Sequence, residues 1–102
     1  MNLDDELELN KRIYDADQAR LVLENEAFQA AFTDIQSEII EQWKQSPARD
    51  ADGREKLWNL LMLSQKLENS LKATLDKGKL ASLELERKRT IPQKVKELIG
   101  WG

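Results

Sequence analysis

The 102-residue chain contains no cysteine and no histidine, and these two absences exclude whole classes of chemistry. Without thiols there is no disulfide framework, no thiolate metal site and no cysteine nucleophile. Without imidazole the chain lacks the commonest transition-metal ligand and the side chain that most often acts as a general base near neutral pH. We therefore expect no metal site and no cofactor.

The sequence also lacks a long apolar run. Its longest apolar stretch, Leu57–Leu63, is interrupted by Asn59, and it is far shorter than the roughly 18 residues that a membrane-spanning helix needs. The N-terminal MNLDDELEL is acidic, and it has neither the basic start nor the apolar centre of a signal peptide. These features predict a soluble protein made in the cytoplasm, with no membrane partner.

Helix breakers are scarce, with only 4 glycines and 2 prolines. Long stretches of strong helix formers lie between them and predict an all-α fold. Asp15–Ala–Asp–Gln18 has the form of a capping box and predicts a helix start. Because Asn25 could cap a fresh start, we expect either a kink at Leu23–Glu26 or one continuous rod.

A bend at about residues 46–52 separates this helix from a second one. Ser46–Pro47 is typical of a helix exit, and Asp52–Gly–Arg–Glu55 is a second capping box. The two predicted helices would therefore run antiparallel about this bend.

The acids before Gly53 raise a calcium loop as an alternative to this bend. Asp50 and Asp52 fit the middle ligands of an EF-hand loop. Aligned on Gly53, however, that loop would begin at Ala48 and end at Asn59, where the motif needs Asp and Glu. The bend between two helices is the better interpretation.

Apolar residues recur at spacings of three, four and seven on both helices, which is typical of amphipathic faces. Antiparallel pairing about the bend brings Trp43 to Trp58 and Ile39 to Met62, so apolar side chains meet over several turns. We therefore predict a long antiparallel helical hairpin. Its predicted core consists of Leu21, Phe28, Phe32, Ile35, Ile39, Trp43, Leu57, Leu61, Leu67, Leu71 and Leu75.

The predicted architecture has three parts: an acidic N-terminal segment (1–14), the hairpin (15–89), and a short C-terminal helix with a tryptophan-containing tail (90–102). The second helix ends at Gly78 or continues through residues 79–89. Thr90–Ile–Pro–Gln93 predicts a restart, because Thr favours the cap and Pro the first turn. The sequence thus predicts a long hairpin with short terminal helices.

A two-helix hairpin leaves apolar surface uncovered, which predicts an oligomer or contacts with other subunits. Near the end of the chain, Trp101 is either a clasp onto the hairpin or a docking anchor for a partner. The candidate partner interface consists of Trp58, Met62, Leu63 and Trp101.

The net charge of −3 hides a strong asymmetry. Residues 1–52 carry 5 basic and 13 acidic side chains, and residues 53–102 carry 11 basic and 6 acidic ones. An acidic half and a basic half can attract each other, either within one chain or between subunits. They can also attract different partners.

A basic segment at residues 77–96 is a candidate nucleic-acid surface. Aromatic interleaving and a helix-turn-helix pattern are missing, and the helix dipole favours cations near helix C-termini in any case. A solvated basic surface is therefore the simpler interpretation. The candidate contacts are Lys77, Lys79, Arg87, Lys88, Arg89, Lys94 and Lys96.

No catalytic pattern stands out. The serines lack a histidine partner and a nucleophile-elbow pattern, and no phosphate-binding GxxxxGK[ST] loop is present. We expect neither enzymatic activity nor a small-molecule ligand.

The stretches ARLVLENEAFQAAF (19–32), IIEQWKQSPARDADGREKLWNLL (39–61) and GKLA (78–81) resemble those of small helical proteins encoded by tailed-bacteriophage genomes. That group has no assigned activity, so the resemblance transfers no catalytic or binding residues. What it implies is a setting in virus assembly, in the host cytoplasm or in the virion.

The leading hypothesis is a non-enzymatic structural or assembly protein of a tailed phage, which binds itself or other phage structural proteins through amphipathic helices. The alternative is a nucleic-acid-binding factor for DNA packaging or regulation that uses the basic segment. A host-directed adaptor or inhibitor is also compatible with the sequence.

Overall fold

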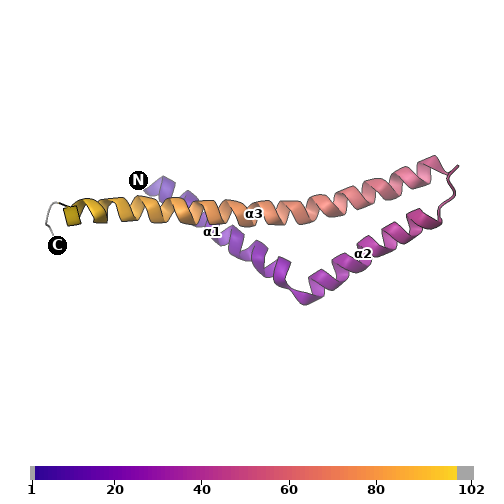
Figure 1. Cartoon of the computed structure of the whole chain (residues 1–102), viewed down its shortest axis with the longest axis horizontal. Coiled ribbons are helices and arrows are strands. Elements are labelled where there is room, and N and C mark those ends of the chain that lie inside the picture. The colour runs from indigo at the N-terminus through magenta and orange to yellow at the C-terminus, as the bar shows by residue number, and fades with distance from the viewer. Residues whose placement is uncertain (1, 99–102) are drawn as a thin grey trace. The chain divides into compact units, whose positions relative to one another are not determined.

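The computed structural model describes the backbone of residues 2–98 and the side chains of residues 2–89. It contains three helices in chain order: α1 (Leu3–Glu24), α2 (Glu26–Gln45) and α3 (Ala51–Leu98) (Figure 1). No strand occurs within residues 2–98, so the all-α prediction is confirmed. Trp101 lies outside the described residues.

The first helix begins earlier than predicted. The backbone amide of Asp5 donates to the side-chain oxygen of Asn2 over 2.8 Å, and acidic residues fill the first turn of α1, where the helix dipole favours them. Residues 3–14 are therefore helical, and the prediction of a start at Asp15 is wrong. An Asp and a Gln three residues apart fit a helix interior as well as a cap.

The break between α1 and α2 falls at Asn25, so the kinked alternative is confirmed. Asn25 has extended backbone angles, φ −70° and ψ 120°, and its side chain accepts from the amide of Phe28 over 2.8 Å. The side chain of Gln29 donates to the carbonyl oxygen of Leu23 over 2.6 Å. Together they satisfy backbone groups on both sides of the break.

Replacing Asn25 by alanine is expected to lower the free energy of unfolding by about 1 kcal/mol, because the amide of Phe28 loses its acceptor. Urea unfolding followed by circular dichroism measures this change. Asn10→Ala, at an exposed interior position of α1, is the control and should be neutral or slightly stabilising. Equal stability of the two variants would contradict the capping role.

The bend is shorter than predicted, and its cap is a different aspartate. The carboxylate of Asp50 accepts from the amide of Gly53 over 3.1 Å, and the carbonyl oxygen of Asp50 accepts from the amide of Arg54. Asp52 lies in the first turn of α3. The predicted cap at Asp52 is therefore wrong by two residues, since the sequence offers two aspartates at cap-like positions.

The third helix continues through Gly78 and through residues 90–93, so the predicted restart at Thr90 is wrong. Threonine and proline after a basic run are compatible with a helix interior at the cost of one backbone hydrogen bond. The predicted short terminal helices are also wrong: α1 has 22 residues, and the C-terminal part belongs to the 48-residue α3.

Two compact units share α3. The α1 unit joins the chain up to Ala19 with the chain from Ala73 onward, and the hairpin unit is Arg20–Lys72.

The core of the α1 unit is small. Leu9, Ala81 and Leu85 form a buried cluster, and Ile13 packs against it. At its outer end, the guanidinium of Arg89 donates to Glu6 over 2.6 Å. Residue numbers rise along α1 as they fall along α3, so these two stretches run antiparallel.

A crossing of small residues lets α1 approach α3 closely. Gly78 is buried, and a Cβ built on it would lie 2.0 Å from the Cβ of Ala16 and 3.0 Å from the carbonyl oxygen of Arg12. Ala16 is itself buried. Only glycine therefore fits at position 78, and its role is close packing rather than the end of a helix.

Candidate protein-contact surfaces

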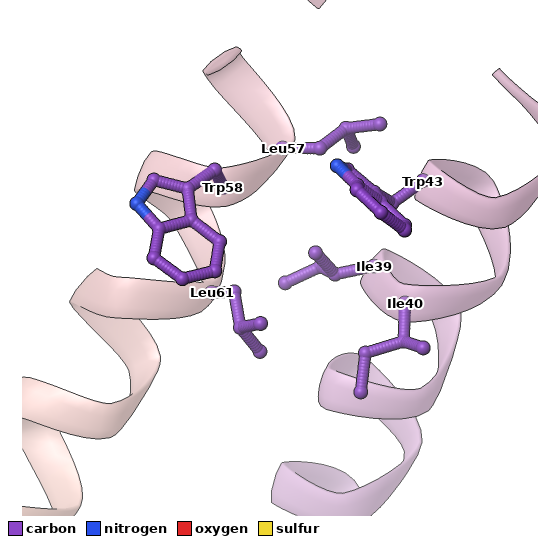
Figure 2. Close-up of a pocket in the computed structure, with 6 residues that line it drawn as sticks. All are labelled: Ile39, Ile40, Trp43, Leu57, Trp58 and Leu61. Carbon is purple, nitrogen blue, oxygen red and sulfur yellow. The ribbon is translucent and has the colours of Figure 1, made fainter. Parts of the chain in front are cut away.

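A hydrogen bond midway along the hairpin unit marks the register of α2 against α3. The amide nitrogen of the Gln36 side chain donates to the hydroxyl of Ser64 over 3.2 Å. Figure 2 shows Ile39 and Leu61 pointing toward one another between α2 and α3. The predicted pairing of Ile39 with Met62 is therefore close, but displaced by one residue.

The first groove lies near the bend and has a volume of about 200 Å³. Its lining is entirely apolar, and it places both Trp43 and Trp58 at one end of the hairpin unit (Figure 2). The lining residues are Ile39, Ile40, Trp43, Leu57, Trp58 and Leu61.

The second groove is larger, about 540 Å³, and lies further from the bend. Its α2 wall is Phe32, Ile35 and Ile39, and its α3 wall contains three leucines, two serines and a lysine. Ile35 and Leu63 are 53% and 64% exposed, so this lining is open to solvent rather than enclosed. The α3 lining residues are Leu60, Leu63, Ser64, Lys66, Leu67 and Ser70.

The residues predicted as hairpin core divide into two groups by burial. Most of them are half-buried, and Phe28 and Phe32 stack with ring centroids 5.7 Å apart. The half-buried residues are Phe28, Phe32, Ile39, Leu57, Leu61, Leu71 and Leu75, and the exposed ones are Leu21, Ile35, Trp43 and Leu67. Two packed helices contact each other along a single line, the seam, so apolar side chains away from the seam remain exposed.

Of the residues predicted as a partner interface, the structure describes Trp58, Met62 and Leu63. Trp58 is 55% exposed and lines the first groove, whereas Leu63 lines the second. Met62 is half-buried. Trp58 and Leu63 therefore line two different grooves, which adjoin at Ile39.

Arg54 holds the bend together, and sequence reasoning missed it. Its guanidinium carbon lies 4.0 Å from the centroid of the Trp43 ring. The same group donates to the carbonyl oxygens of Trp43 and Ser46, over 3.3 and 3.1 Å, and to the Ser46 hydroxyl over 3.0 Å. A lone arginine near the start of a helix carries no sequence signal for this role.

The basic segment meets acidic side chains within the α1 unit. Arg89 pairs with Glu6 over 2.6 Å, and Lys88 pairs with Glu84 over 3.2 Å. Lys77 lines a mixed groove together with Glu8 and Asp15. The N-terminal acids therefore offset part of the positive charge of the basic segment.

Most of the basic side chains of this segment that the structure describes stay exposed. Lys77, Lys79, Arg87 and Arg89 are exposed and Lys88 is half-buried, whereas the side chains of Lys94 and Lys96 lie outside the described residues. Ion pairs therefore occupy Lys88 and Arg89 without covering the basic surface.

Within the described residues, no cluster of three or more acidic side chains is arranged to hold a metal ion. None of the helices in that part of the chain has an apolar stretch that could cross a bilayer. The chain matches no protein-family model, and neither the curated proteins nor the solved structures gave a significant match.

Proposed function

We propose that this chain is a non-enzymatic structural or assembly protein that acts through protein–protein contacts of its amphipathic helices. The observation that carries the proposal is the apolar surface of the hairpin unit, where one groove is lined wholly, and the other mostly, by aliphatic and aromatic side chains. Contiguous exposed apolar surface of this kind marks interaction sites in soluble proteins.

The chemistry of the chain supports the same proposal. Its side chains lack thiols and imidazoles, and the grooves present few polar groups that could orient a substrate. The resemblance to phage-encoded helical proteins supplies the setting, with other phage structural proteins or further copies of this chain as partners. Host cytoplasm during assembly, or the virion, is the corresponding location.

A nucleic-acid-binding role is the second candidate, favoured by the exposure of Lys79 and Arg87. Its weakness is the pairing of Lys88 and Arg89 with carboxylates, because paired cations release fewer counterions from a phosphate backbone. The two candidates differ most clearly in their response to salt.

Light scattering of the full chain, with and without a mixed-sequence DNA duplex, separates the two functions. We expect a mass above that of the 11.8 kDa chain, unchanged by DNA and by moderate salt. The double variant Lys79→Glu/Arg87→Glu should behave like the parent. A mass increase with DNA that appears only at low salt and disappears in this variant would favour nucleic-acid binding instead.

A further inference from the structure

The second groove of the hairpin unit forms a distinct apolar stripe on α3. Leu60, Leu63 and Leu67 follow one another at spacings of three and four, beside the seam residues Leu57 and Leu61. A helix with two adjacent apolar stripes packs against two neighbouring helices. Within the hairpin unit, α2 covers the first stripe only, since Leu60 and Leu67 are each 51% exposed.

The two edges of this face carry opposite charges. On α2, the helical repeat places Glu38 and then Asp34 beyond Ile35, on the side away from the seam. On α3, the same repeat places Lys56 within the leucine stripe and Lys66 beyond it, and Lys66 lines the groove itself. The face therefore has acids at its α2 edge, and bases within and beyond the leucine stripe on its α3 side.

These edge charges have no ion-pair partner within the chain, as far as the described side chains go. Among residues 2–89, neither Asp34 nor Lys66 takes part in an ion pair. An apolar face with an acidic edge and a basic edge is complementary to a second copy of itself.

We infer that a second copy of this chain covers the second groove, with the two-fold axis parallel to the helices, so that α2 of each copy packs on α3 of the other. This inference deepens the proposed function and rests on it. It assigns the partner of this face, the symmetry of the contact and the charges that fix its register.

The register follows from the contact between Gln36 and Ser64. Asp34 comes two residues before Gln36 and Lys66 two residues after Ser64, so in an antiparallel pair they lie at the same level. A two-fold axis parallel to the helices preserves this level, and it brings Asp34 of one copy opposite Lys66 of the other. An axis perpendicular to the helices would stack α2 on α2 and set acids against acids, which is unfavourable.

The size of the face is sufficient for such a pair. Two helices of about 20 residues lying side by side present a surface of roughly 30 Å by 20 Å. Two copies would then bury about 1,200 Å² together, which is within the range of specific protein–protein interfaces.

A matched pair of leucine variants in the full chain locates the contact. Leu63→Glu introduces a charge into the second groove, and we expect the dimer dissociation constant in sedimentation equilibrium to rise at least about a hundredfold. The control is Leu80→Glu, because Leu80 is 68% exposed on the same helix in the α1 unit. It should leave the constant unchanged, and circular dichroism should show full helix content in both variants.

Charge reversal tests the symmetry. Asp34→Lys alone and Lys66→Glu alone should each weaken self-association about tenfold, since each reverses one charge in both symmetric contacts. When the two variants are mixed, every contact again joins opposite charges, so a heterodimer as strong as the parent dimer should form. No other face of the chain predicts this restoration.

The outcomes separate this inference from the proposed function. A dimer that tolerates Leu63→Glu, or a mixture that stays weak, overturns the inference and leaves a role in assembly through another face. A chain that stays monomeric at every concentration and ignores DNA also overturns it, and the occupant of the groove would then be a different protein. Association only with DNA at low salt would contradict the proposed function itself.

Discussion

Replacing Gly78 by leucine is expected to detach α1 from α3 and to lower the free energy of unfolding of the α1 unit by about 3 kcal/mol. The Cβ alone would approach the Ala16 Cβ to 2.0 Å and a backbone oxygen of Arg12 to 3.0 Å. Leucine favours helix over glycine by roughly 0.8 kcal/mol, so a loss of stability cannot come from propensity. Hydrogen exchange of the α1 amides and urea unfolding measure the effect.

The matched control for this variant is Ser82→Leu, which places the same side chain at an exposed position of the same helix. It should leave α1 protected from exchange. A second test combines Gly78→Ala with Ala16→Gly, which removes the closest clash and should recover part of the stability that Gly78→Ala alone loses. If Gly78→Leu stabilised the chain, the close crossing of the two helices would be refuted.

The second large effect is expected at Arg54, where alanine should destabilise the hairpin unit by about 2 kcal/mol. The guanidinium satisfies carbonyl oxygens at the end of α2, and hydrogen bonds from charged donors contribute about 1.5–3 kcal/mol. Its position over the Trp43 ring adds a cation–π contribution. Urea unfolding followed by tryptophan fluorescence measures this loss, because Trp43 reports on the bend directly.

Arg54→Lys distinguishes the geometry of the arginine from its charge. Lysine keeps the charge, but as a point donor it cannot reach two carbonyl oxygens and a hydroxyl while lying flat on a ring. We therefore expect Arg54→Lys to recover less than half of the loss. Full recovery would mean that charge near the C-terminus of α2 is sufficient, and Arg49→Ala, an exposed arginine in the same bend, is the control for a general charge effect.

Local patterns predicted the all-helical structure, and they predicted the pairing of α2 with α3 to within one residue. The spacing of Phe32, Ile39 and Leu61 defines amphipathic faces, and a face of this kind depends on neighbours a few residues away. The helix boundaries were predicted less well, because Asn2, Asp15, Asp50 and Asp52 all have the chemistry of a cap. Sequence alone does not rank competing caps, since tertiary contacts decide which one is used.

The packing of α1 on α3 could not be predicted in the same way. Its central residues are Ala16, Gly78 and Ala81, which in a sequence indicate helix propensity or a helix end rather than a contact. Burial of such small side chains depends on a close approach of two backbones, and that approach is set by residues far apart in the chain. The pairing of Glu6 with Arg89 could not be predicted for the same reason, because these two residues are also far apart in the chain.

That long separation has a consequence for the order of folding. Glu6 and Arg89 are 83 residues apart in the sequence, whereas α2 and the start of α3 are joined by a short bend. Local contacts form before contacts that close long loops, so we expect the hairpin to assemble first. During translation at about 5–20 residues per second, α1 would wait roughly 4–17 seconds for its partner to be made. The apolar side chains of α1 that later pack against α3 would therefore be the first surface that a chaperone contacts.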